Sequence, residues 1–132
     1  MEKLKVFLDS NVVFSVAYSE KGKSRSYLFF ELQNLNIVKI YISNLVKFES
    51  IHNIKIKKPE KLDFLNELLS KADIIEDVYV YYEFAKNLPE NDRIILSSAV
   101  YHDIDFLTFY NKKLKNTLIL TPKDFLELTF EK

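Results

Sequence analysis

The sequence contains no cysteine and only one glycine, Gly22. Without cysteine the chain can form neither a disulfide framework nor a thiolate metal site, so a metal ion would need oxygen or histidine ligands. A single glycine excludes the glycine-rich phosphate loops of dinucleotide-binding and P-loop proteins, which need several glycines for close backbone approach. The lack of cysteine also fits an intracellular protein, and we expect a cytoplasmic one.

An excess of charge and a long apolar run are also lacking. Nineteen basic residues balance 19 acidic ones, so the overall charge gives no argument for a polyanion partner. No stretch approaches the ~18 apolar residues of a membrane span, and the apolar run after Met1 is too short for a signal peptide because it ends at Asp9. With 48% hydrophobic residues, the chain is expected to form a single domain over residues 1–132.

Strand and helix patterns alternate along the chain. Strands are predicted over 5–8, 37–42, 72–75, 104–108 and 117–120, and helices over 11–18, 24–35, 44–53, 60–70 and 78–86, with two more starting near residues 89 and 121 and a turn or short helix over 111–114. That order is typical of the α/β class. We therefore predict a three-layer α/β/α sandwich with a mostly parallel sheet of four to five strands.

Asp9 comes directly after the first apolar strand. Open α/β sheets have their ligand crevice at the C-terminal ends of parallel strands, so Asp9 is a candidate catalytic or metal-binding residue. The alternative is that Asp9 only caps the helix that follows. Asn11 is expected to hold Asp9 or a bound water by hydrogen bonds, or to cap the same helix.

Two further acids are predicted to lie near this crevice. In the helix over 44–53, Glu49 shares a face with Leu45, Phe48 and His52 and should point inward with the apolar residues. A buried carboxylate needs a cation or hydrogen-bond donors, so Glu49 requires a partner. Asp92 lies in the first turn of the helix that starts near Pro89, where stabilisation of the helix end is the alternative role.

If Asp9, Glu49 and Asp92 converge, their charges repel unless a cation neutralises them. Ligation by oxygen atoms alone, without thiolates, selects a hard divalent ion such as Mg²⁺ or Mn²⁺. Such an ion lowers the pKa of a bound water and neutralises charge on a phosphate.

Several segments together resemble the PIN-domain ribonucleases. They are Phe7 to Asn11, Glu49 after the second strand, Pro89 to Leu96 continuing to Ala99, Asp105 to Thr108, and Leu118 to Leu126. The resemblance covers the whole chain and implies that Asp9, Glu49 and Asp92 bind Mg²⁺ or Mn²⁺ and cleave RNA. It also implies a possible role as the toxin of a VapC-like toxin–antitoxin pair, with an antitoxin protein as partner.

The fourth acid of that family is missing. The family usually has an aspartate after the threonine of the fourth strand, whereas Thr108 is followed here by Phe109, Tyr110 and Asn111. Asp103 and Asp105 are predicted to lie too far away to replace it. We expect a three-carboxylate site supported by Thr108 and by Asn111 as a neutral ligand or water anchor. The alternative is a catalytically weakened PIN-like domain that binds RNA or protein.

Lysine-rich runs over 21–25, 55–61 and 112–115 are either solvated surface or contacts for an RNA backbone. Those at 21–25 and 112–115 are predicted to flank the crevice. The aromatic residues Tyr79, Tyr81, Tyr82 and Phe84 could stack on bases, pack in the core or form a dimer interface, and we expect a homodimer.

Overall fold

A computed structural model describes residues 3–79, 82–111 and 116–130 of the chain. Its sheet has five strands in the order β3-β2-β1-β4-β5. The strands are β1 (Leu4–Phe7), β2 (Val38–Ser43), β3 (Asp73–Ile75), β4 (Phe106–Asn111) and β5 (Asn116–Leu120). The first four run parallel to their neighbours, and β5 pairs antiparallel with β4 at the edge of the sheet.

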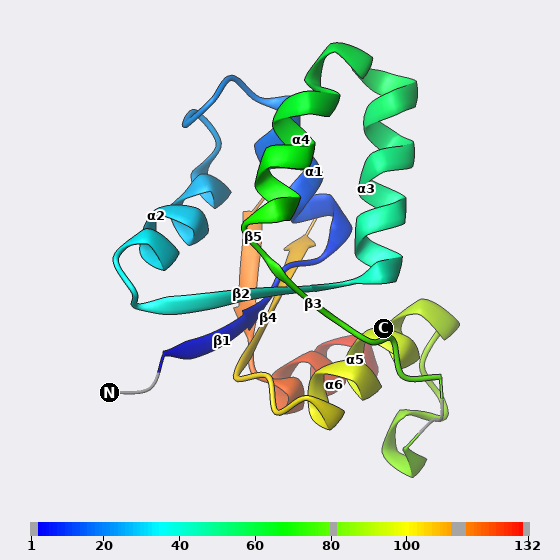
Figure 1. Cartoon of the computed structure of the whole chain (residues 1–132). Helices are drawn as coiled ribbons and strands as arrows, with labels where there is room; N and C mark the ends of the chain where they lie inside the picture. Colours follow the sequence, from blue (N-terminus) through cyan, green and yellow to red (C-terminus); the bar gives the residue numbers. More distant parts are fainter. Residues whose placement is uncertain (1–2, 80–81, 112–115, 131–132) are drawn as a thin grey trace.

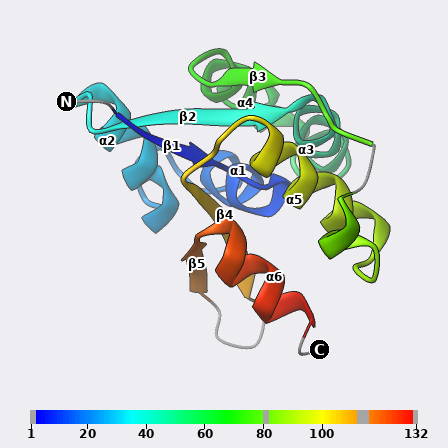
Figure 2. The same ribbon diagram turned by 90° about the horizontal axis from the view of Figure 1, so that it is seen from below.

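Helices cover both faces of this sheet (Figure 1). They are α1 (Ser10–Tyr18), α2 (Leu28–Asn34), α3 (Asn44–Lys57), α4 (Leu62–Ser70), α5 (Glu90–Tyr101) and α6 (Pro122–Phe130), with short 3-10 turns η1 (Arg25–Tyr27), η2 (Pro59–Lys61) and η3 (Glu83–Ala85). One face carries α1, α3 and α4, which pack on one another, and the opposite face carries α5 and α6 (Figure 2). The predicted three-layer α/β/α sandwich with a mostly parallel sheet is therefore confirmed.

The central strand β1 sets the register of the sheet. Its last residue, Phe7, lies opposite Tyr41 of β2 on one side and Leu107 of β4 on the other. Phe7, Leu8 and Leu107 are fully buried, as expected for a parallel strand covered on both faces. The residues that follow β1 therefore emerge at the centre of one sheet edge, where β2 and β4 also end.

The helix predicted over residues 78–86 is wrong in the part of the segment that the structure describes. Val78 and Tyr79 are irregular, residues 80–81 lie outside the described chain, and only η3 is helical. Tertiary hydrogen bonds fix the start of this segment: Val78 N–H donates to Ser98 Oγ of α5 at 2.8 Å, and Asp77 Oδ2 accepts from Leu45 N–H of α3 at 3.0 Å. These bonds tie the loop to two helices and leave its backbone without helical partners.

The face predicted for the third helix is also wrong. The buried residues of α3 are Val46, Ser50 and Ile54, whereas Phe48 is 65% exposed and His52 is exposed. Ser50 takes a core position because its hydroxyl donates to Val46 O at 2.7 Å, which satisfies the buried oxygen. Glu49 thus lies at the margin of the buried face.

The other predicted elements differ mainly at their ends. The third helix continues to Lys57 instead of ending near residue 53, and the fourth strand begins at Phe106 and runs to Asn111. The turn or short helix predicted over 111–114 falls largely outside the described residues. In the part of the chain that the structure describes, no helix is long and apolar enough to cross a membrane.

Candidate functional site

Asp9 lies at the junction between β1 and α1. The ladder continues past β1, because Leu8 N–H donates to Tyr41 O at 3.0 Å, and the chain then turns into α1 at Ser10. Asp9 is the N-cap of α1, with Oδ1 accepting from Val12 N–H at 2.8 Å. The capping role considered for Asp9 is therefore real, and it places this half-buried carboxylate at the C-terminal edge of the sheet.

Thr108 fixes the backbone of this junction from the neighbouring strand. Its buried hydroxyl donates to Phe7 O at 3.1 Å and accepts from Asp9 N–H at 3.3 Å. The two bonds hold the chain on either side of Leu8 against β4. Thr108 thus positions Asp9 through its backbone, and its role in a catalytic site stays a prediction.

Ser10 connects the junction to Glu49 of α3. The Ser10 hydroxyl donates to Glu49 Oε2 at 2.8 Å across two helices that pack side by side. Sequence reasoning missed Ser10, because a serine at a helix start is most often only a capping residue. Its position directly after Asp9 was the one available signal.

Glu49 has a neutral partner. It is half-buried, and among the residues that the structure describes it forms no ion pair, so the Ser10 hydroxyl is its only polar contact there. Withdrawing a carboxylate from water without a cation is costly. Glu49 therefore provides a carboxylate, hydrogen-bonded to the residue after Asp9, that a cation would stabilise.

Asp92 is the third residue of α5. Pro89 precedes this helix at the N-cap without a side-chain cap, and Asp92 lies half-buried in the first turn. Figures 1 and 2 show α3 and α5 both beginning on the side of the sheet where β2 ends. Asp92 therefore belongs to the helical layer opposite that of α1 and α3. Its helix begins on the side of the sheet where the β1–α1 junction lies.

The three acids do not form a ready-made metal cluster. Among the described residues, no group of three or more histidine, aspartate or glutamate side chains is placed to hold a metal ion. The structure joins Glu49 to Ser10, the residue adjacent to Asp9, and the convergence of Asp92 with these two acids stays a prediction. A pocket of about 320 Å³ lies elsewhere and contains none of these acids; it is lined by Lys47, Asn66, Leu69, Ser70, Ala72 and Ile74.

The two predicted asparagines have different outcomes. Asn11 is exposed, and in the described part of the chain it makes no hydrogen bond to Asp9, which itself caps α1. The role predicted for Asn11 in holding Asp9 is therefore not seen. Asn111 ends β4, where its backbone pairs with Asn116, and its side chain lies outside the described atoms.

Asp105 already has a hydrogen-bond partner, and it lies at the opposite end of the sheet from Asp9. Its carboxylate accepts from Lys5 N–H at 2.8 Å, beside the start of β1. This bond agrees with the expectation that Asp105 cannot replace the missing fourth acid. Asp103 lies in the turn after α5 with a positive φ of 55°, and its N–H donates to Val100 O.

The fold is that of an α/β protein with a mostly parallel sheet and with the Asp9 carboxylate directly after the central strand β1. The sequence model of the PIN domain matches residues 6–118, so the chain belongs to the PIN-domain family. This match includes Asp9, Glu49, Asp92, Thr108 and Asn111. PIN domains have a nuclease-type fold and are in general Mg²⁺- or Mn²⁺-dependent nucleases that bind RNA. No curated protein matches the chain significantly.

Proposed function

We propose that this chain is a metal-dependent endoribonuclease, formed by a single domain, that hydrolyses phosphodiester bonds in RNA. The observation that carries the proposal is the hydrogen bond by which Ser10, the residue after Asp9, holds the half-buried Glu49 carboxylate, a group that forms no ion pair among the described residues. Membership of a family of metal-dependent nucleases supports it. Asp9, Glu49 and Asp92 are the proposed ligands of Mg²⁺ or Mn²⁺.

The donor set fits such an ion. It consists of carboxylate oxygens, and hard divalent cations prefer oxygen ligands. When bound, the ion acidifies water and neutralises charge on the scissile phosphate. The protein contributes positioning: Thr108 fixes the backbone of Asp9, and Ser10 orients Glu49. Because Asp9 Oδ1 already caps α1, the cap also limits the rotation of this carboxylate.

Cleavage of a mixed RNA pool tests the proposal. Wild type should cleave the pool in Mn²⁺ and not in excess chelator, and Glu49→Gln should lose cleavage while retaining its fold. Gln keeps an oxygen acceptor for Ser10 but removes the charge. Equal cleavage by wild type and Glu49→Gln would point to a contaminating nuclease and would contradict the proposal.

A second candidate is a catalytically weakened PIN domain that binds RNA or protein. Two observations favour it: the described acids form no preassembled cluster, and the position expected for the fourth acid holds Tyr110 or Asn111, neither of which is a carboxylate. RNA binding without Mn²⁺-dependent cleavage would support this candidate. Calorimetry with Mn²⁺ alone adds a second readout. A protein that is inactive because it no longer binds the ion should give no heat of Mn²⁺ binding.

The finer roles of the protein are also proposals. We infer a toxin that pairs with an antitoxin protein, on the basis of the family resemblance, and a neighbouring gene for a small DNA-binding protein would support this role.

A homodimer is supported by exposed aromatic residues near η3: Tyr79 is 61% exposed, and Tyr82 stacks on Phe84 with ring centroids 5.2 Å apart. Sedimentation of wild type and Tyr79→Ser tests it, and a monomeric wild type would contradict it.

A further inference from the structure

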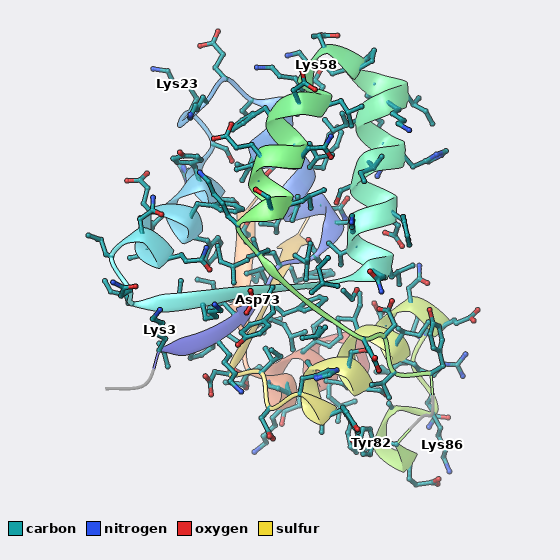
Figure 3. The ribbon with its side chains drawn as sticks, viewed as in Figure 1. Lys3, Lys23, Lys58, Asp73, Tyr82 and Lys86 are labelled. Carbon is teal, nitrogen blue, oxygen red and sulfur yellow. The ribbon has the colours of Figure 1, made fainter. Side chains whose placement is uncertain are left out.

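Basic side chains gather where α1 and α3 end. We call this region the cationic end; its residues are Lys21, Lys23, Arg25, Lys55, Lys57, Lys58 and Lys61. Within residues 18–25 and 55–61 there are seven basic residues and two acidic ones, in a chain that is neutral overall. Figure 3 shows Lys23 at the upper left and Lys58 at the top of the molecule, both away from the start of α3.

The location corrects the prediction that the run at 21–25 flanks the crevice. This run follows α1, whose nine residues span roughly 13 Å from Ser10, so it lies at the far end of that helix. The run at 112–115 lies outside the described residues. The cationic end is thus a surface separate from the acids, although α1 and α3 connect the two.

Specific contacts join the two segments of the cationic end. Lys58 Nζ donates to Tyr18 O at 3.2 Å and lies 4.5 Å from the centroid of the Tyr18 ring. Lys57 Nζ lies 5.3 Å from the centroid of the Phe14 ring. Cation–π contacts of this kind restrict the lysine side chains, so binding an anion costs less conformational entropy there.

Structural roles explain only part of this charge. Lys55 and Lys57 lie in the last turn of α3, where positive charge stabilises the helix dipole. Among the described residues, Lys21 is the only one of the seven in an ion pair, with Glu67 at 3.7 Å between exposed side chains. Such an exposed ion pair contributes little free energy, so it offsets little of the positive charge of the cationic end. The other six cations form no ion pair among the described residues, so their charge is available to a polyanion.

We propose that the cationic end binds the phosphate backbone of a single-stranded RNA whose scissile bond lies at the Asp9–Glu49 site, an inference that rests on the proposed function. Lys57 is eight residues after Glu49, about 12 Å along α3, so one extended strand can contact both regions. Lysine contacts phosphate as a point charge and does not read bases. The contact therefore adds affinity for longer RNA without sequence preference.

Binding of labelled oligouridylates in chelator tests this inference, because cleavage is then absent. With a strand of about 12 nucleotides, replacing Lys57 and Lys58 by Gln should flatten the slope of log affinity against log salt by about 1.4, since each lost phosphate contact on single strands contributes about 0.7.

Two matched variants serve as controls. Replacing Lys86 and Lys123 by Gln changes the net charge equally at exposed positions outside the cationic end and should leave the slope unchanged. Replacing Lys57 and Lys58 by Arg keeps the charge and should keep the slope, so a folding defect cannot mimic the result. Equal slopes for both Gln pairs would overturn the inference.

The outcome is separable from that of the proposed nuclease activity. Mn²⁺-dependent cleavage together with equal slopes would leave the nuclease intact and overturn the cationic end as an RNA site. A flattened salt slope for the Lys57 and Lys58 Gln pair, without cleavage by wild type in Mn²⁺, would support the cationic end and count against the nuclease. Anionic phospholipid vesicles are the remaining probe: binding to vesicles through Lys57 and Lys58, with no binding to RNA, would overturn the inference.

Discussion

Ser10 and Glu49, which are 39 positions apart in the chain, are joined by a side-chain hydrogen bond of 2.8 Å. Ser10 is the first residue of α1, and Glu49 lies in the second turn of α3. The bond holds the Glu49 carboxylate against Ser10, and Ser10 directly follows Asp9, the other acid of the proposed site. It is therefore the contact through which the packing of two helices assembles the proposed site.

Ser10→Ala should weaken this arrangement. A hydrogen bond to a charged group is worth about 1.5–3 kcal/mol, and partial exposure reduces it here to about 1 kcal/mol. We expect Mn²⁺ affinity to fall roughly fivefold and metal-free stability to fall by a similar free energy, as measured by calorimetry and urea unfolding. Ser10→Thr keeps the hydroxyl and is the control. Unchanged affinity in Ser10→Ala would show that Ser10 does not position Glu49 for an ion.

Asp9 combines a cap with a proposed ligand, and two substitutions separate these roles. Asp9→Asn keeps an oxygen acceptor for Val12 N–H, so the cap persists, while the loss of charge should abolish Mn²⁺ binding. Because carboxylate repulsion also falls, its melting temperature should equal or exceed that of wild type. Asp9→Ala also loses the cap and should be less stable by about 1 kcal/mol. A large drop in the melting temperature of Asp9→Asn would mean that the charge itself is structural.

Thr108→Val should destabilise the protein and disturb the site together. The buried hydroxyl serves Phe7 O and Asp9 N–H, and leaving such groups unpaired costs about 1–3 kcal/mol. Thr108→Ser retains both bonds and loses only a methyl group, worth about 0.8 kcal/mol of burial. The free energy of unfolding in urea should therefore be lower for Thr108→Val than for Thr108→Ser. A Thr108→Val protein as stable as wild type, with a loss only in Thr108→Ser, would indicate that methyl packing, not the hydroxyl, is what matters at this position.

Local patterns predicted most of the fold. The apolar run up to Leu8 and the β-branched run ending at Ile42 are buried strands, and Pro89 marks the start of α5. The helix predicted from Val78 onward is wrong because the conformation of this segment depends on hydrogen bonds of Val78 and Asp77 to residues far away in the sequence. Periodicity in an aromatic run cannot reveal such partners, since core and surface aromatics look alike in sequence.

The site was predictable only in part. Asp9 follows from strand and helix order alone, because that order fixes the sheet edge. Glu49 was identified through an inward face that is wrong, since Ser50 takes the core position and Phe48 the exposed one. Ser10 required the packing of α1 on α3, which no local pattern contains. The convergence of Asp92 with the other acids stays a prediction.

The missing fourth acid gives the last test. Thr108 lies beside the β1–α1 junction, and Asn111 follows three residues later at the end of β4, on the side where β1 also ends. If Asn111 occupies the acid position of the family, Asn111→Asp adds a negative ligand. Mn²⁺ affinity and any RNA cleavage should then both rise.

A screened surface charge would act differently. An aspartate away from the ion would change the binding free energy by well under 1 kcal/mol at moderate salt. Calorimetric titration of wild type and Asn111→Asp with Mn²⁺ separates the cases, and Asn66→Asp, at an exposed position of α4, is the control. Equal affinities for wild type and Asn111→Asp would remove Asn111 from the site. They would also remove the argument that this chain is a nuclease with one altered ligand, and would favour a PIN domain used for binding.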